Sequence, residues 1–210
     1  MDRPTTSPVF SPAAGLYALK PRFVARLTRL ADALASRRVH PDAITAAGLA
    51  CSLLGGAALA ASATHPVWLW AVPLLAFARI LFNALDGLVA RRTGQARPWG
   101  LVLNEVSDRV ADVAFLGGLL FAAASPVLLG VALIAVLLAS YVGVVAQAAG
   151  APRQYGGPLG KADRMLWLSL AAVAVALTGD ARVWSLLLAG FVAGALLTAV
   201  RRLEATHAAL

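Results

Sequence analysis

The chain has 210 residues, of which 60% are hydrophobic and 13% charged, with a formal net charge of +8. This composition and a mean hydropathy of +0.78 exclude an ordinary soluble domain, so we expect one integral membrane domain over residues 1–210. The basic residues flank apolar segments, which suits membrane orientation and contact with anionic lipids and does not indicate a nucleic acid partner. The single cysteine, Cys51, excludes an internal disulfide.

The chain starts with a polar tail followed by a helical pattern. Residues 1–20 contain three prolines with serines and threonines, which indicates a flexible tail. Residues 22–38 predict an amphipathic helix that lies in the membrane interface. The alternative is a solvated helix packed on another part of the protein. The apolar side of this helix is expected to hold Phe23, Leu27, Leu30 and Leu34.

Six apolar segments follow, and together they predict an all-α bundle over residues 42–203. Most are long enough to cross a hydrocarbon core of roughly 30 Å at about 1.5 Å per residue. We therefore expect six transmembrane helices. The predicted segments are 42–63, 66–91, 99–123, 126–149, 164–179 and 181–202.

The distribution of basic residues predicts the orientation of these helices. With six spans, 15 of the 18 Lys and Arg residues fall on one side of the membrane, and only Arg182 falls on the other. Arg79 and Arg109 lie inside predicted spans. Because positive charge marks the cytoplasmic side, both termini are expected there, in a multi-pass protein of the cytoplasmic membrane.

Polar residues recur at helical spacing in the second predicted span. Asn83, Asp86, Gly87 and Ala90 stand at i, i+3, i+4 and i+7, so they share one helix face. A charged side chain near the bilayer centre costs roughly 2.5–3.5 kcal/mol and usually faces the bundle interior. This face is therefore expected to be turned inward.

The third predicted span carries a matching polar face. Gly100, Asn104, Asp108 and Asp112 step by four residues, and Glu105 borders the same stripe. The short loop between the two spans predicts antiparallel neighbours whose polar faces meet. Their carboxylate and amide oxygens would suit Mg²⁺, Mn²⁺ or Ca²⁺. The alternative is a structural network of ion pairs, with Asp86 paired to Arg79 and Asp108 to Arg109.

These residues resemble the motif of the CDP-alcohol phosphotransferases, also called CDP-alcohol phosphatidyltransferases. That motif is D-x-x-D-G-x-x-A-R, eight residues, then G-x-x-x-D-x-x-x-D. Here the same spacing holds Asn83, Asp86, Gly87, Ala90 and Arg91, followed by Gly100, Asn104 and Asp108. Six of the eight fixed positions match, and the stretch from His40 to Gly48 resembles the family more weakly.

The resemblance implies an activity in phospholipid biosynthesis. The family transfers a phosphoalcohol from a CDP-alcohol, often CDP-diacylglycerol, to a second alcohol and releases CMP. It implies six spans, a site open to the cytoplasm, one or two Mg²⁺ or Mn²⁺ ions, and a homodimer. By the same resemblance Asp108 is the candidate general base. The implied metal ligands are Asn83, Asp86, Asn104 and Asp108, and the implied CDP-binding residues are Asp86, Gly87, Ala90, Arg91 and Gly100.

Two amides depart from the motif, because Asn83 and Asn104 stand where the family has its first and third aspartates. An amide oxygen ligates a hard cation without contributing charge, so metal binding should be weaker. Glu105 and Asp112 could compensate as further metal ligands. The site could instead hold one metal, or the chain could have kept the fold and lost the chemistry.

The loop before the fifth span is basic. Arg153, Lys161 and Arg164 resemble, loosely, the residues that hold the phosphate of a phosphorylated acceptor in the family. An ordinary cytoplasmic loop explains the same charges. For the whole protein the leading prediction is a membrane transferase. The alternatives are a silent family member that binds a CDP-lipid or a partner, and a small transporter that uses its buried acids.

Overall fold

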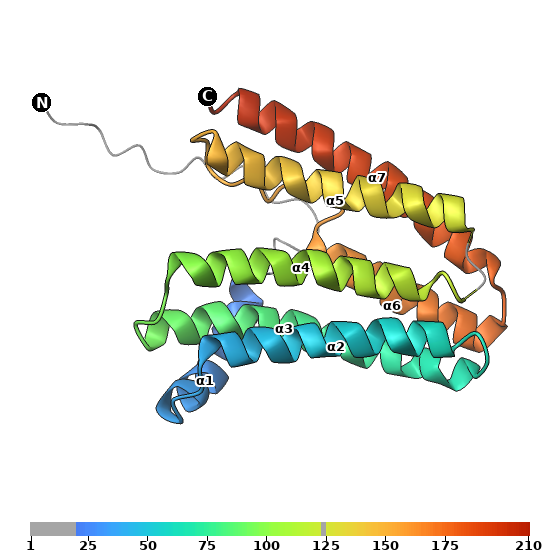
Figure 1. Cartoon of the computed structure of the whole chain (residues 1–210), viewed down its shortest axis with the longest axis horizontal. Helices are drawn as coiled ribbons and strands as arrows, with labels where there is room; N and C mark the ends of the chain where they lie inside the picture. Colours follow the sequence, from blue (N-terminus) through green and yellow to red (C-terminus); the bar gives the residue numbers. More distant parts are fainter. Residues whose placement is uncertain (1–19, 123–124) are drawn as a thin grey trace, which may run out of the picture.

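The computed structural model describes residues 20–122 and 125–210. Within these ranges the chain is helical and contains no strand, and the long helices run side by side (Figure 1). Four helical segments begin at a proline, at positions 41, 66, 98 and 126, where the missing N–H costs no hydrogen bond. The helices are α1 (Lys20–Ser36), α2 (Pro41–Ala61), η2 (Pro66–Trp70), α3 (Ala71–Arg92), α4 (Pro98–Gly118), α5 (Pro126–Ala148), α6 (Lys161–Thr178) and α7 (Arg182–His207).

The predicted all-α architecture is confirmed, although several boundaries differ. The second predicted segment is divided into a 3₁₀ turn, η2, and the α-helix α3. Helix α6 begins three residues before its predicted start, at Lys161, and α7 continues to His207. The predicted tail, residues 1–20, lies outside the described residues except for Lys20, the first residue of α1.

Helix α1 contacts the bundle through α3. Ala31 is fully buried in a small apolar cluster with Leu85, Leu88 and Val89, and Arg92 donates a hydrogen bond to Asp32. Leu30, expected on the apolar side of this helix, is 43% exposed. The predicted helix is therefore present, and part of its surface packs on the protein as the alternative interpretation required.

Four helical segments are long and apolar enough to cross a membrane. Helices α4 and α6 carry more charge: Glu105, Asp108, Arg109 and Asp112 lie on α4, and Lys161, Asp163 and Arg164 lie on the first turn of α6. Large apolar side chains on the outside, such as Phe77 and Ile134, suit a lipid environment. The four segments are Pro41–Ala61, Pro66–Arg92, Pro126–Ala148 and Arg182–His207.

Small residues allow α2 and α4 to cross closely. A Cβ atom on Gly56 would lie 2.2 Å from the carbonyl oxygen of Ala114, and one on Gly55 would lie 2.1 Å from the ring of Phe115. Helix α2 also packs against α3, so that these three helices form one group, while α5 packs against α7 and α6 contacts both groups. The close α2–α4 crossing brings the polar residues of α2, α3 and α4 together.

The segment between α5 and α6 is anchored on α7. The backbone N–H of Leu159 donates to Thr198 Oγ1 at 3.1 Å, and Arg202 donates to the carbonyl oxygens of Ala139 and Gly156 at 2.6 and 2.9 Å. Gly157 has φ of +116°, and a Cβ there would lie 2.4 Å from Thr198. This anchoring fixes the start of α6 and therefore the backbone of Lys161.

Candidate functional site

Helices α3 and α4 turn their polar faces toward each other, as the spacing predicted. The amide nitrogen of Asn83 on α3 donates to the oxygen of Asn104 on α4 at 2.6 Å. The same nitrogen donates to Asp108 Oδ1 at 3.0 Å. The two amides therefore bridge the helices directly.

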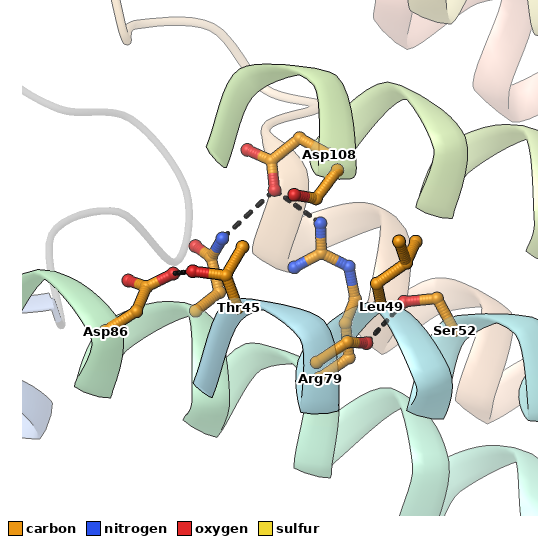
Figure 2. A pocket seen from close by; sticks show the side chains of 9 residues that line it. Thr45, Leu49, Ser52, Arg79, Asp86 and Asp108 are labelled. Carbon is orange, nitrogen blue, oxygen red and sulfur yellow. Dashed lines mark hydrogen bonds and ion pairs between the residues drawn. The ribbon is translucent and has the colours of Figure 1, made fainter. Parts of the chain in front are cut away.

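Asp86 is buried at the junction of α2 and α3, with 7% of its surface exposed. Thr45 Oγ1 donates to its Oδ2 at 2.8 Å (Figure 2). The backbone N–H of Gly87 donates to its Oδ1 at 2.6 Å. Among the described residues, no basic side chain forms an ion pair with Asp86. Its hydrogen-bond donors, the Thr45 hydroxyl and the Gly87 N–H, are both neutral.

Asp108 has the opposite surroundings. Arg79 Nη2 lies 2.5 Å from its Oδ1 and Lys161 Nζ lies 2.6 Å from its Oδ2, so both carboxylate oxygens face a cation. The Arg79 and Asp108 side chains are each only 4% exposed, and Figure 2 shows the guanidinium aimed at the carboxylate. Lys161 also donates to Asn83 Oδ1. We call Asp108, Arg79, Lys161 and Asn83 the cation centre.

The ion pairs correct the network expected from the sequence. Arg79 pairs with Asp108 on the neighbouring helix and not with Asp86, seven residues further along its own helix. Arg109 lies 3.9 Å from Asp108 and 3.6 Å from Asp112, and its Nε and Nη1 atoms are buried with no hydrogen-bond partner. A structural network of ion pairs is thus present. It includes the predicted pair of Asp108 with Arg109, at 3.9 Å, whereas Arg79 has a different partner from the one predicted.

The two flanking acids are also in ion pairs. Arg164 donates to both oxygens of Asp112 at 2.9 and 3.1 Å, in a pair that is almost completely buried. Arg153 donates to Glu105 and lies 5.0 Å from the ring centre of Tyr155. All three cations expected at an acceptor phosphate, Arg153, Lys161 and Arg164, are therefore each paired with a carboxylate of α4.

A pocket of about 380 Å³ opens beside Asp86. This volume is within the usual range for a small-molecule site. A Cβ atom on Gly87 or Gly100 would meet only the side chain of Arg91 or Arg97, respectively, so the space next to both glycines is open. The wall includes all five residues predicted to bind CDP, namely Asp86, Gly87, Ala90, Arg91 and Gly100, together with Asp42, Thr45, Arg97 and Asn104.

A second cavity of about 10 Å³ lies deeper, between α2, α3 and α4. Such a volume holds roughly one water molecule. Asp86 and Thr45 line both cavities, while Arg79, Asn83 and Asp108 line only the inner one. Asp86 therefore stands between the open pocket and the cation centre.

The side chains do not fit the predicted one or two divalent ions. Both oxygens of Asp108 and the oxygens of Asn83 and Asn104 already accept hydrogen bonds, three of these four atoms from a protein cation. In the part of the chain that the structure describes, no three His, Cys, Asp or Glu side chains form a group able to hold a metal. Glu105 and Asp112, proposed as compensating ligands, are held by Arg153 and Arg164.

Sequence reasoning missed Thr45 as a partner of Asp86. It lies in the stretch His40–Gly48, which was noted only for its weaker resemblance to the family. Thr45 is one turn into α2, where the side chain of His40 caps the helix by accepting from the N–H of Asp42. A hydroxyl at the start of an apolar helix was the available signal, because such a group needs a polar partner.

Comparison with known proteins agrees with this geometry. The model of the family described as CDP-alcohol phosphatidyltransferase matches residues 38–201. The inner membrane protein YnbA of Escherichia coli is 36% identical over 174 residues, which are 82% of this chain and 86% of that protein. A phosphatidylinositol phosphate synthase of Cutibacterium acnes is 33% identical over 162 residues, covering 73% of this chain and 74% of the relative.

Solved structures share the fold. The phosphatidylinositol phosphate synthase of Mycobacterium tuberculosis with CDP-DAG bound has a TM-score of 0.72 at 25% identity, covering 88% of this chain and 94% of that chain. The same enzyme in complex with manganese and citrate has a TM-score of 0.71, covering 86% and 88%. Since the family model covers more than half of the chain, the protein belongs to the CDP-alcohol phosphatidyltransferase family.

Proposed function

We propose that the protein transfers a phosphatidyl or related phosphoalcohol group from a CDP-alcohol, CDP-diacylglycerol in the first instance, to an acceptor alcohol. The observation that carries this proposal is the open pocket, whose wall includes all five predicted CDP-binding residues, Asp86 among them. Membership of the family and the CDP-DAG complex of a relative support the same substrate class.

The wall of the pocket suits a nucleotide diphosphate. The wall is formed in part by small residues, Gly87 and Ala90 on α3 and Gly100 on α4. Their size leaves room for a flat base and ribose. Arg91 and Arg97 lie at the same wall, and their guanidinium groups suit phosphate oxygens. The cytidine would rest on the small residues, with its diphosphate directed toward Asp86 and Asn104.

The reaction exchanges one phosphorus–oxygen bond for another. The acceptor hydroxyl oxygen bonds to the phosphorus that carries the lipid alcohol, and the bond from that phosphorus to the bridging oxygen breaks. CMP leaves with the bridging oxygen, and the hydroxyl proton passes to a base. We keep Asp108 as the candidate base, which requires Lys161 to move away from Oδ2, since that oxygen now accepts from Lys161.

We also propose that α2–α7 all cross the cytoplasmic membrane, with both termini and the pocket on the cytoplasmic side and two copies forming a homodimer. The charges of α4 and α6 support this arrangement because they face the protein interior in ion pairs. The predicted excess of positive charge on one side supports the orientation.

The test is CMP release by the purified protein in detergent. CDP-diacylglycerol and a pool of candidate alcohols are supplied, once with Mg²⁺ or Mn²⁺ and once with a chelator. CMP release that disappears in Asp108→Asn supports the transferase, and removing alcohols one at a time then identifies the acceptor. Lack of release under every condition, together with lack of CDP-diacylglycerol binding, would refute the proposal.

A second candidate is a silent family member that binds a CDP-lipid without turnover. One observation favours it: both oxygens of Asp108 accept from basic side chains, so the candidate base acts as a counter-ion in this arrangement. Binding of CDP-diacylglycerol without CMP release from any acceptor would select this candidate.

A further inference from the structure

The cation centre places two protein cations where the sequence motif suggested a divalent metal. Arg79 and Lys161 contact opposite oxygens of Asp108 at 2.5 and 2.6 Å. We propose that these two side chains replace the metal: they supply its positive charge permanently, the centre takes no divalent ion, and Lys161 neutralises the diphosphate of the bound CDP-lipid. The last part of this inference rests on the proposed function.

The charges of the centre are already balanced without a metal. Asn83 and Asn104 are neutral, so the polar faces of α3 and α4 present Asp86 and Asp108 as carboxylates at the predicted ligand positions. Arg79 and Lys161 pair closely with Asp108 and Arg109 lies 3.9 Å from it, which leaves no excess negative charge there to attract a divalent ion. A metal in this place would also be repelled by Arg79 and Lys161 at short range.

The hydrogen bonds of the centre are equally complete. Asn83 donates to Asn104 and Asp108 and accepts from Lys161, so its amide has a partner at both ends. A metal ion ligated by Asn83 or Asp108 would have to break contacts with Lys161. With aspartates at positions 83 and 104, the same geometry would instead hold four carboxylates and would require more positive charge. The neutral amides at positions 83 and 104 therefore match the presence of the two cations, Arg79 and Lys161, in place of a metal ion.

Arg79 and Lys161 differ in exposure, and this difference assigns their roles. The Arg79 side chain is 4% exposed inside the α2–α3–α4 group, whereas Lys161 is 27% exposed at the start of α6. The anchored segment before α6 fixes the Lys161 backbone, while its long flexible side chain can still change partners. Lys161 can thus turn from Asp108 toward a diphosphate that reaches Asn104, which lines the pocket. That movement frees Asp108 Oδ2 to accept the proton of the acceptor alcohol.

The first experiment measures metal binding directly. Mn²⁺ is titrated into the purified protein in detergent, with and without CDP, and bound ion is followed by electron paramagnetic resonance. We expect no stoichiometric binding at millimolar Mn²⁺. One or two ions bound per chain would overturn the inference. This result does not depend on CDP-lipid binding or turnover, so it separates failure of this inference from failure of the proposed function.

The second experiment tests the role of Lys161 in ligand binding. CDP-diacylglycerol affinity is measured in chelator and in Mn²⁺ for the unaltered protein, Lys161→Met, Lys161→Arg and Arg182→Met. Arg182 is exposed at the start of α7, so its replacement removes one charge far from the centre. We expect equal affinity with and without metal, a roughly ten- to hundredfold loss in Lys161→Met, and near-normal affinity in the other two variants. Affinity that requires Mn²⁺, or that Lys161→Met leaves unchanged, would overturn the assignment.

A gain-of-function variant completes the test. Asn83→Asp, Asn104→Asp and Lys161→Met together add two carboxylates and remove one cation from the centre. We expect stoichiometric Mn²⁺ binding in this variant, seen by the same resonance measurement, and CDP-diacylglycerol binding that now requires the metal. If the folded triple variant binds no Mn²⁺, then the amides and Lys161 do not determine metal exclusion and the inference fails.

Discussion

The open pocket and the cation centre share Asp86 and Thr45 at their boundary, yet they are built in opposite ways. The pocket has small residues, open space beside its glycines, and a carboxylate whose hydrogen-bond donors are neutral. The cation centre borders a cavity of only about 10 Å³, and its carboxylate is neutralised by Arg79 and Lys161. The difference separates a surface ready to receive a ligand from a charged core that already contains its own counter-ions.

The charged core continues into the buried Arg164–Asp112 ion pair, which joins the same two helices as Lys161 and Asp108, and the largest effect is expected where that pair is broken. Arg164→Met removes the buried partner of Asp112 and should lower the free energy of unfolding by about 3 kcal/mol, because an unpaired buried carboxylate is costly. Arg109, 3.6 Å from Asp112, keeps the loss near the lower end of the usual range. Unfolding in mixed detergent micelles measures this loss of free energy. The double variant Arg164→Met with Asp112→Leu should recover most of the stability, and a double variant as unstable as the single one would contradict this explanation.

The next effect concerns the pocket, and it should leave the charged core untouched. Gly87→Leu places a side chain in the open space and should weaken CDP-diacylglycerol binding roughly ten- to hundredfold, by steric overlap. The control is Gly190→Leu on α7, because a Cβ at Gly190 meets no atom within 4 Å and this glycine does not line the pocket. Equal binding by the two variants would show that the nucleotide lies elsewhere.

The two regions also differ in how far the sequence predicted them. Helical spacing placed Asp86, Gly87 and Ala90 on one face, and the family resemblance added Arg91 and Gly100. The structure gathers all five at one pocket. Spacing fixes which residues share a face of one helix, since each turn takes about 3.6 residues. Residues that share a face of one helix can therefore be grouped without knowing where the neighbouring helix lies.

The partners within the cation centre could not be predicted in this way. Arg79 and Asp86 share a face but stand about 10 Å apart along the helix axis, while Asp108 of α4 lies directly opposite Arg79. That match depends on the axial register of α3 relative to α4. Helix α2 packs on both, and its close crossing with α4 at Gly56 helps to set this register. Lys161 arrives from α6 because the preceding segment is anchored on α7. Both facts belong to tertiary packing and leave no periodic signal in the sequence.

A smaller effect is expected at the boundary between the two regions. Thr45→Val removes one hydrogen bond to the buried Asp86 while keeping the shape of the side chain, and should cost about 1.5 kcal/mol of stability. Thr45→Ser keeps the hydroxyl and should cost less. Thermal unfolding in detergent compares the two. If both variants lose the same stability, the methyl group of Thr45 matters and its hydrogen bond does not.

The smallest effect is expected at the rim of the pocket, where charge meets solvent. Arg97 on the N-terminal side of α4 pairs with Asp42 at the start of α2, and both side chains are substantially exposed. Arg97→Met should therefore change the free energy of unfolding by less than about 1 kcal/mol, because water and salt screen such a pair. Added salt should reduce the stability of the unaltered protein toward that of the variant. Because Arg97 also lines the pocket, the variant should still weaken CDP-diacylglycerol binding at low salt. A stability loss as large as that of Arg164→Met would mean that the rim belongs to the same charged core, and the distinction between the two regions would then fail.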